Sequence, residues 1–251
     1  MQLELSGKSA LVTGSSRGIG RVIAGVLHAE GCRLAINARN ADDLTRAAAD
    51  LPGAVVVAGD VSNPDEAQRV VGGVTAAFGG LDILICNVGS GRSVPPGDET
   101  YAEWQRVFAL NLWSTTNSVE VAREVLIASR GVVVCISSIC GSEVVPGAPV
   151  TYSAAKAALH AYVRGISRDL GKHGVRINAV APGNVLFDGS VWARKLAQDA
   201  AAVQTMLDRD VALGRLGTPQ DVAELVAYLA SPRAGFATGG VWTLDGGQVH
   251  S

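Results

Sequence analysis

The chain has 251 residues, of which 48% are hydrophobic and 18% charged, which suits one large α/β domain with a substantial core. A formal net charge of −2, without any basic run, excludes the electrostatic footprint of a nucleic-acid-binding protein. No apolar stretch is long enough to span a bilayer and the first residues lack a signal-peptide pattern, so we expect a cytoplasmic protein without a membrane partner.

Short apolar runs alternate with helical patterns along the whole chain. The runs predict strands over residues 9–13, 32–37, 54–61, 81–87, 131–138, 175–180 and 241–245. Apolar positions with helical spacing predict helices over 19–30, 41–50, 64–78, about 101–128 and 219–231, and one more that carries Tyr152. Strands this continuously apolar are typical of parallel sheets buried on both faces by helices. We therefore predict a single α/β domain over residues 1–251, a Rossmann-type doubly wound parallel sheet of about seven strands with helices on both faces.

The first of these strands runs into a glycine-rich turn, T-G-S-S-R-G-I-G at residues 13–20, which opens the first helix. Ligands of doubly wound sheets bind outside the carboxyl ends of the strands, where this turn lies. Its glycines allow close approach of the backbone to a ligand, and a helix N-terminus favours an anion such as pyrophosphate. The alternative is a turn that only packs the helix on the strand, but this role would not explain why three glycines occur at one junction. We predict that the turn binds a dinucleotide through Gly14, Ser16, Arg17, Gly18, Ile19 and Gly20.

The same turn also fits the G-x-S-x-G nucleophile elbow of serine hydrolases, with Ser16 as the nucleophile. Asp245 and His250 follow in the order of the catalytic triad of that class. This second hypothesis explains neither Gly20 nor the tyrosine–lysine pair described below, and we rank it under dinucleotide binding. A P-loop is excluded because no Gly-Lys-Ser/Thr follows the turn.

The end of the second strand indicates which dinucleotide the turn binds. NAD is held there by an acidic residue that bonds the ribose hydroxyls, but this chain has Asn37 and Ala38, followed by Arg39. Arg17 and Arg39 together suit the 2′-phosphate of NADP, because guanidinium groups bind phosphate through charge-assisted hydrogen bonds. We therefore predict NADP(H) in preference to NAD(H); the alternative is that both arginines are ordinary surface residues. Further along this edge we predict cofactor contacts at Asp60, Val61, Asn87 and Gly89.

Tyr152 and Lys156 lie four residues apart in an alanine-rich helix, which puts both side chains on one face. A free phenol has a pKa of about 10, and a close ammonium would lower that pKa by roughly 1 to 3 units. The pair therefore predicts that Tyr152 is a proton donor and that Lys156 lowers its pKa. Ser138 closes the fifth strand, where its hydroxyl would bond a substrate oxygen, whereas Ser137 alternates to the other side. Each residue alone also has a purely structural interpretation: a tyrosine at the edge of the core, a solvated lysine and a hydroxyl that caps a loop.

Six motifs occur in the order seen in short-chain dehydrogenases/reductases: T-G-S-S-R-G-I-G, N-V-G, A-L-N-L-W, I-S-S-I-C-G, Y-S-A-A-K and N-A-V-A-P-G. The chain resembles this family over nearly its whole length, in the form of a 3-oxoacyl-[acyl-carrier-protein] reductase. The resemblance implies a homotetramer, with a segment at about 184–217 that covers the substrate. It implies catalytic roles for Asn111, Ser138, Tyr152 and Lys156, the lysine also holding the nicotinamide ribose and sharing a proton relay with the asparagine. Further cofactor contacts would come from Tyr152, Lys156, Pro182, Gly183 and Val185.

Some positions depart from the motifs of the family. Cys86 stands where the first asparagine of N-N-A-G would be, and we expect it to fill that space as a small apolar residue. Phe187 stands where a threonine often bonds the nicotinamide carboxamide, which leaves backbone groups around Val185 for that contact. Asn111 also has a purely structural alternative, in which its side chain bonds the backbone and bends its helix. The four cysteines have no ligand-like spacing with one another or with the histidines, which predicts neither a metal site nor disulfides.

The residues and the resemblance together imply NADPH-dependent reduction of a ketone to a secondary alcohol by hydride transfer, with Tyr152 as the proton donor. The ketone would be a 3-oxoacyl thioester or another small carbonyl compound. The expected partner is therefore a small carbonyl or alcohol substrate, either free or linked to an acyl carrier or CoA. Two alternatives stay open: a sugar or secondary-alcohol dehydrogenase that works in the oxidative direction, and a non-catalytic NADP-binding sensor.

Overall fold

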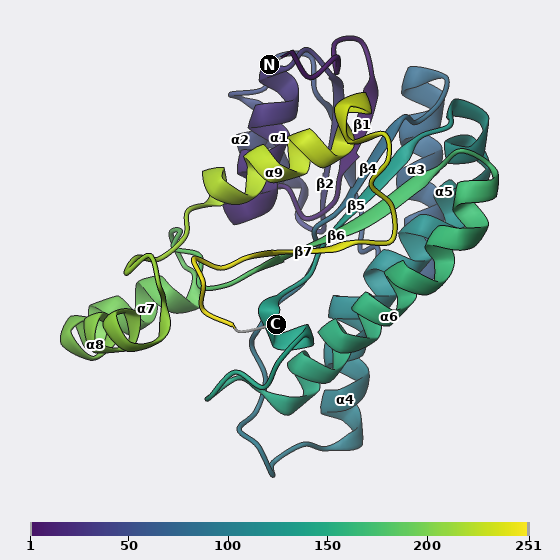
Figure 1. Cartoon of the computed structure of the whole chain (residues 1–251). Helices are drawn as coiled ribbons and strands as arrows, with labels where there is room; N and C mark the ends of the chain where they lie inside the picture. Colours follow the sequence, from purple (N-terminus) through teal and green to yellow (C-terminus); the bar gives the residue numbers. More distant parts are fainter. Residues whose placement is uncertain (1, 250–251) are drawn as a thin grey trace.

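The computed structural model describes residues 2–249, and one parallel sheet forms its centre (Figure 1). In these residues seven strands follow in the order β3-β2-β1-β4-β5-β6-β7, each parallel to its neighbours. They are β1 (Ser9–Val12), β2 (Arg33–Ala38), β3 (Val55–Ala58), β4 (Ile83–Cys86), β5 (Val132–Ile136), β6 (Arg176–Pro182) and β7 (Val241–Leu244). The order reverses between β1 and β4, and such a switch point is where doubly wound sheets bind ligands. The predicted fold is confirmed.

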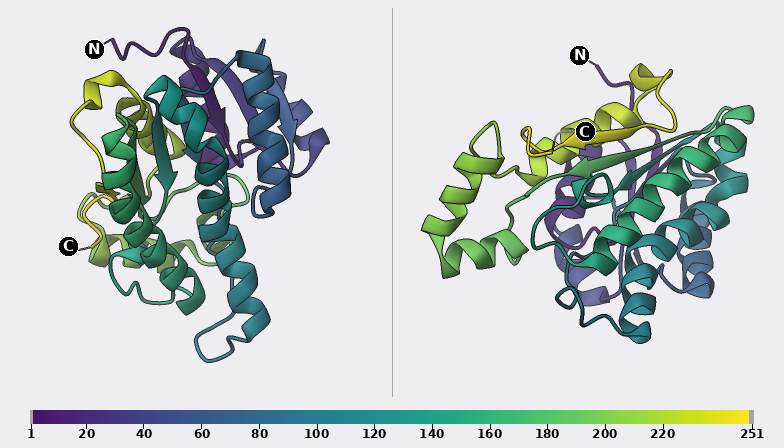
Figure 2. Two further views of the ribbon diagram at one scale, coloured as in Figure 1. Left: turned by 90° about the vertical axis from the view of Figure 1, so that its right-hand side faces the viewer. Right: turned by 60° about the horizontal axis from the view of Figure 1, so that its bottom comes forward.

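Two helical layers cover the sheet, one on each face (Figures 1 and 2). On one face lie α1 (Gly18–Ala29), α2 (Ala41–Ala48) and α9 (Pro219–Ala230). On the other lie α3 (Pro64–Phe78), α5 (Ser114–Ser129) and α6 (Val150–Lys172). Alternate strand residues supply the two cores, since Val12 and Ile36 join the first whereas Leu11 and Ala35 join the second. No helix among the described residues is long and apolar enough to cross a bilayer.

The central strands are buried along their whole length, but the two edge strands are not. Every residue of β1, β4 and β5 is buried, as the apolar runs predict. In β3, by contrast, alternate residues are exposed, and Trp242 in β7 is 38% exposed. The prediction of strands covered on both faces is therefore wrong for the edges, because an edge strand lies at the rim of the helical layers.

The long helix predicted over residues 101–128 is divided into three parts. α4 (Tyr101–Phe108) ends in a π-helical turn (Ala109–Trp113), after which α5 begins. Such turns are frequent at functional sites. This one carries Asn111, whose side chain bonds Ser90 in the loop after β4. The predicted helical region is confirmed, but the π-helical turn was not predicted, since no glycine or proline in A-L-N-L-W marks it.

α7 (Val191–Gln198) and α8 (Ala200–Asp210) project from the sheet as an arm, here defined as residues 187–216 (Figure 1). The arm has a small apolar core of its own, formed by Trp192, Leu196, Val203, Met206, Leu207, Val211 and Leu216. The Nζ atom of Lys195 lies 4.4 Å from the ring centroid of Trp192. This aromatic side chain and the lysine above it therefore stabilise the arm itself.

Candidate active site

The glycine turn lies between β1 and α1, beside the end of β4. The side-chain amide of Asn87, just after β4, donates to the carbonyls of Thr13 (3.1 Å) and Gly14 (2.9 Å). Gly14 and Gly18 have φ angles of 63° and 59°, which glycine adopts at little cost. At Gly20 a Cβ would lie 2.3 Å from the amide nitrogen of Asn87, so a larger residue would push the turn away from β4. Asn87 thus fixes the turn at the switch point of the sheet.

Phe187 lies against the same turn. A Cβ on Gly18 would lie 2.7 Å from the Phe187 ring, so the ring packs directly on the first residue of α1. Glycine at this position therefore serves both the left-handed backbone and the approach of the ring. Because Phe187 is the first residue of the arm, this contact joins the arm to the glycine turn.

An open hollow of about 470 Å³ beside the turn is lined by Ser16, Arg17, Arg21, Asp43 and Arg46. Arg21 pairs with Asp50 and Arg46 pairs with Asp43, whereas Arg17 forms no ion pair with any described residue. The excess of guanidinium groups makes the hollow attractive to an anion such as phosphate. Sequence reasoning missed Arg21 and Arg46. The first was detectable, since it follows Arg17 by one helical turn.

Arg39 and Asp60, two predicted cofactor contacts, pair with each other after β2 and β3. The Nη1 atom of Arg39 lies 3.7 Å from Oδ2 of Asp60, and the arginine side chain is 73% exposed. Val61, the next predicted contact, is buried in the second core. Asn37 is fully buried, and its amide donates to two carbonyls at and just after the end of β3, at 2.9 and 3.1 Å. Asn37 therefore joins two strands, and no carboxylate takes the place at which NAD would be bonded.

Ser138, Tyr152 and Lys156 come together where β5 ends and α6 begins. The hydroxyl of Ser138 lies close enough to that of Tyr152 to lower the tyrosine pKa, and the Nζ atom of Lys156 lies 5.8 Å from the centroid of the Tyr152 ring. Lys156 is 3% exposed and donates to the carbonyl of Ile136 in β5 at 2.9 Å. The tyrosine and the lysine share one helical face, as their spacing predicts, and the serine joins them from the strand.

Burial dominates the titration of this cluster. It raises the pKa of Tyr152 to about 12, although the nearby hydroxyl of Ser138 acts in the opposite direction. Burial also lowers the pKa of Lys156 to about 8, because an ammonium group loses its hydration in the interior. The predicted lowering of the tyrosine pKa is therefore wrong in this structure, since desolvation of the phenolate is the largest cause of the shift and Lys156 is not among the groups that lower the pKa. Near pH 7, Tyr152 is a protonated phenol.

Asn111 reaches the cluster through the loop after β4. Its Oδ1 accepts from the Ser90 amide at 2.9 Å, and its own amide donates to the carbonyls of Ser90 (3.2 Å) and Val107 (3.0 Å). A Cβ on Gly89 would lie 2.9 Å from Oδ1 of Asn111 and 3.2 Å from Nζ of Lys156, so the glycine separates these two side chains. The bond to Val107, one turn earlier in the helix, agrees with the structural alternative, in which Asn111 bonds the backbone of its own helix. The structure adds the position of Asn111 next to the lysine.

Two cysteines lie behind the cluster and a third borders it. Cys86 and Cys135 are opposite each other on β4 and β5 and both are buried, and the neighbouring thiol raises the pKa of Cys86. Cys86 thus occupies an apolar space, as predicted, and its neighbour is a second thiol. The amide of Cys140 donates to Ser138 Oγ at 3.2 Å, and burial raises the pKa of the Cys140 thiol. Within residues 2–249, no group of His, Cys, Asp and Glu side chains is arranged to hold a metal ion.

The backbone that follows β6 is fixed at the base of the arm. Gly183, after the last strand residue Pro182, passes so close to β7 that a Cβ would lie 2.7 Å from Cβ of Asp245. Val185 is 8% exposed and pairs with Gly217, and two backbone hydrogen bonds of 2.8 Å flank this bridge. These predicted contacts therefore lie along one rigid edge, at the carboxyl end of β6.

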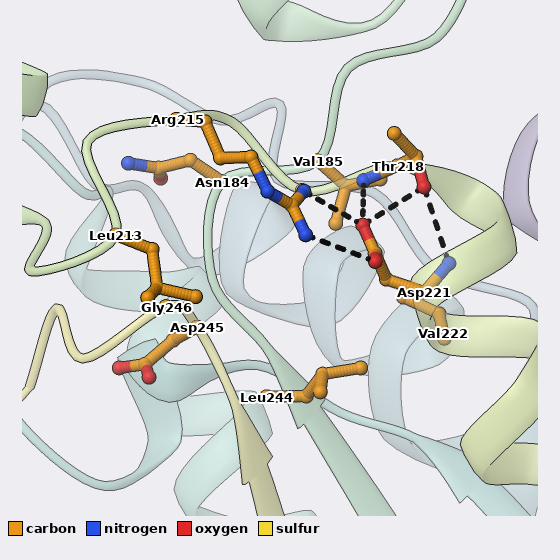
Figure 3. A pocket seen from close by; sticks show the side chains of 11 residues that line it. Asn184, Val185, Leu213, Arg215, Thr218, Asp221, Val222, Leu244, Asp245 and Gly246 are labelled. Carbon is orange, nitrogen blue, oxygen red and sulfur yellow. Dashed lines mark hydrogen bonds and ion pairs between the residues drawn. The ribbon is translucent and has the colours of Figure 1, made fainter.

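A pocket of about 80 Å³ lies at the base of the arm (Figure 3). Arg215 holds its rim by donating to both carboxylate oxygens of Asp221, at 3.0 and 3.1 Å. Asp245 also lines this pocket and accepts from two backbone amides that follow it, at 2.9 and 2.8 Å. Ser16 lines the arginine hollow instead, and His250 lies outside the described residues. Ser16 and Asp245, proposed for a hydrolase triad, thus belong to two separate pockets.

Residues 14–249 match the family model described as Enoyl-(Acyl carrier protein) reductase. The chain is 34% identical over 249 residues to the 3-oxoacyl-[acyl-carrier-protein] reductase FabG of Vibrio cholerae, covering 98% of this chain and 99% of that protein. It is 32% identical over 254 residues to 3beta-hydroxysteroid dehydrogenase 1 of Eggerthella lenta, covering 98% and 95%. L-sorbose reductase from Gluconobacter frateurii, solved with NADPH and L-sorbose, has a TM-score of 0.93 and 29% identity, with both chains covered completely.

These relatives are named for three substrate classes: a 3-oxoacyl carrier, a hydroxysteroid and a sugar. All three names describe an oxidation or a reduction, which contradicts the serine-hydrolase hypothesis and agrees with the tyrosine–lysine–serine cluster. The family match extends from the glycine turn to the last described residue. The chain therefore belongs to the short-chain dehydrogenase/reductase family of oxidoreductases.

Proposed function

We propose that the protein is an NADP(H)-dependent reductase that converts a ketone to a secondary alcohol by hydride transfer, with Tyr152 as the proton donor. The observation that carries the proposal is the convergence of Ser138, Tyr152 and Lys156 at the carboxyl edge of the sheet. Family membership supports oxidoreductase chemistry with a nicotinamide cofactor. Cofactor preference, direction and substrate are inferred from the residues of this chain.

The residues at the switch point fit a nicotinamide dinucleotide. Gly14, Gly18 and Gly20 keep side chains away from the N-terminus of α1, whose free N–H groups favour a pyrophosphate. The hollow beside Arg17 suits the 2′-phosphate of NADP, and Arg39 adds a second cation. Bound in this cleft, the cofactor supplies the hydride. Its other proposed contacts are Ser16, Ile19, Asp60, Val61, Asn87, Gly89, Tyr152, Lys156, Pro182, Gly183 and Val185.

Side chains of the protein supply the proton and stabilise the charge that develops on the substrate oxygen. The hydroxyls of Ser138 and Tyr152 lie close together, so one carbonyl oxygen can accept from both. As the carbonyl carbon gains the hydride, the O–H bond of Tyr152 breaks and its proton passes to the alkoxide oxygen. Lys156, charged below its pKa of about 8, stabilises the phenolate that remains. Asn111, next to the lysine, continues the path by which a proton returns to the tyrosine.

The segment at 184–217, which contains the arm, is proposed to cover the substrate. A 3-oxoacyl thioester on an acyl carrier or CoA is one candidate, supported by similarity to FabG, and a smaller carbonyl compound is the other, supported by the L-sorbose reductase. The second candidate function is oxidation of a sugar or another secondary alcohol, which the hydroxysteroid dehydrogenase favours. We propose that the whole chain forms one NADP-binding domain and assembles as a homotetramer.

Steady-state oxidation of NADPH with a panel of ketones tests the proposal, with NADH, the oxidised cofactors and a panel of alcohols in parallel. Tyr152→Phe removes the proton donor and keeps the ring, so kcat should fall by about 100-fold to 10,000-fold. NADPH binding, followed by cofactor fluorescence, should not change.

Retained turnover in Tyr152→Phe would contradict the mechanism. Binding of NADPH by the native protein without turnover of any substrate would favour the sensor. Turnover confined to alcohols and oxidised cofactor would favour the dehydrogenase.

A further inference from the structure

Behind the catalytic cluster lies a buried histidine that the mechanism above does not use. α6 presents Tyr152, Lys156 and His160 on one face, because each follows the last by four residues. These side chains meet three consecutive residues at the end of β5: the Ile136 carbonyl accepts from Lys156, the Ser137 hydroxyl is hydrogen-bonded to His160, and Ser138 lies close to Tyr152. Strand and helix are therefore joined by three successive contacts, two of which belong to the catalytic cluster.

The middle contact is short and buried. Nε2 of His160 lies 2.7 Å from Oγ of Ser137, and these residues are 3% and 5% exposed. The backbone of Gly141 packs against the ring and favours its charged form. In the neutral ring, Nε2 either accepts the hydroxyl proton of Ser137 or donates to its oxygen. Burial lowers the pKa of His160 to about 4, so the ring is neutral near pH 7.

Gly141 brings the loop after β5 directly onto α6. A Cβ on Gly141 would lie 2.7 Å from the backbone carbonyl carbon of Lys156 and 2.8 Å from Cε1 of His160. The histidine thus holds the loop on both sides of Ser138, at the residue before it and at the residue three positions after it. Because the Ser138 hydroxyl is itself bonded within this loop, any displacement of the loop displaces the hydroxyl.

We propose that His160, together with Ser137, is a positioning residue that clamps the Ser138 loop to α6 and so sets the separation of Ser138 and Tyr152. The inference rests on the proposed function for the roles of those two hydroxyls. Two donors that must reach one oxygen tolerate little displacement, since a misplacement of about 1 Å costs on the order of 100-fold in rate. The clamp acts at β5 and α6, away from the glycine turn after β1, so cofactor binding should not depend on it.

Kinetics of clamp variants give the first test. Ser137→Ala removes one end of the clamp and His160→Leu removes the polar ring, and each should lower kcat by about 10-fold to 100-fold. KM should change far less, and NADPH binding by fluorescence should not change. The double variant should lose no more than either single variant, because one contact is lost only once. His160→Gln, whose amide reaches the place of Nε2, should recover part of kcat, which a merely structural role would not predict.

Alkylation of Cys140 gives a second readout that needs no turnover. This thiol is partly exposed, whereas the other three, Cys32, Cys86 and Cys135, are buried. With iodoacetamide and mass spectrometry, Ser137→Ala and His160→Leu should alkylate Cys140 several-fold faster than the native protein, and Cys140→Ala provides the blank. Both readouts must move: native kcat or a native alkylation rate in Ser137→Ala overturns the clamp, even if His160→Leu fails to fold. If the native protein turns over no substrate, the proposed function fails, and the alkylation rates still decide the clamp.

Discussion

Arg17 and Arg39 carry the same charge in different surroundings. Arg17 borders the hollow beside the glycine turn and pairs with no described carboxylate, whereas Arg39 lies 3.7 Å from Asp60. An unpaired guanidinium offers its whole fork of donors to a phosphate, while a paired one must share them. Arg17 should therefore contribute more than Arg39 to binding of the 2′-phosphate.

Arg17→Ala should raise the Kd of NADPH about 10-fold, which corresponds to roughly 1.4 kcal/mol, and leave the Kd of NADH little changed. Arg39→Ala should act in the same direction by a smaller factor. Titration of cofactor fluorescence measures both constants. Arg69→Ala is the matched control, because it removes an exposed arginine of α3 that pairs with Glu66. Equal losses of NADPH and NADH affinity would contradict a role at the 2′-phosphate.

Residue identities were predictable at the site, but their electrostatics were not. The helical spacing of Tyr152 and the strand end at Ser138 are local patterns, and both residues reach the expected place. The pKa of Tyr152 depends on what packs over the ring, which spacing does not reveal. His160 shows the same limit, since its partner Ser137 belongs to another element and only tertiary packing brings them together.

At the scale of elements, regular helices and central strands follow from local periodicity, while the interruptions depend on packing. The π-helical turn at Ala109–Trp113 has no sequence marker, and the arm was expected only as part of a segment that covers the substrate. The junction of the arm with α1 is an example. Gly18 begins α1 with a left-handed backbone, and the ring of Phe187 fills the space that a side chain would need.

Gly18→Ala should destabilise the protein by about 1 to 2 kcal/mol through the backbone alone, and further through collision with the Phe187 ring. Adding Phe187→Ala should relieve only the collision, so a double-mutant cycle should give a coupling energy of roughly 1 kcal/mol. Urea unfolding measures each variant. Gly25→Ala is the control within α1: a Cβ there meets nothing within 4 Å, so stability should rise by about 0.5 to 1 kcal/mol. Additive effects at positions 18 and 187 would show that the ring does not press on the turn.

For the whole molecule, the proposed catalytic cluster lowers the stability of the fold. The sheet and its two helical layers bury Lys156 almost completely, with the Ile136 carbonyl as its hydrogen-bond acceptor. Folding lowers its pKa from the ordinary 10.5 to about 8, so between these values the unfolded chain binds a proton that the folded protein lacks. Stability from this group therefore rises with pH through that window, and the full penalty of the buried charge applies below about pH 8.

Lys156→Met removes the charge and keeps a side chain of similar length. The shift of the lysine pKa corresponds to about 3 kcal/mol of folding free energy, which the variant gains by removing the buried charge. Loss of the hydrogen bond to the Ile136 carbonyl reduces this gain by about 1 kcal/mol. The variant should therefore be inactive but more stable than the native protein at pH 7, and its advantage should disappear by about pH 10.5. Urea unfolding of both proteins at pH 7, 9 and 10.5 measures this difference, in which all other titrating groups cancel to first order. A difference that does not change with pH would mean that folding leaves the pKa of Lys156 at its ordinary value, so that burial does not penalise its charge.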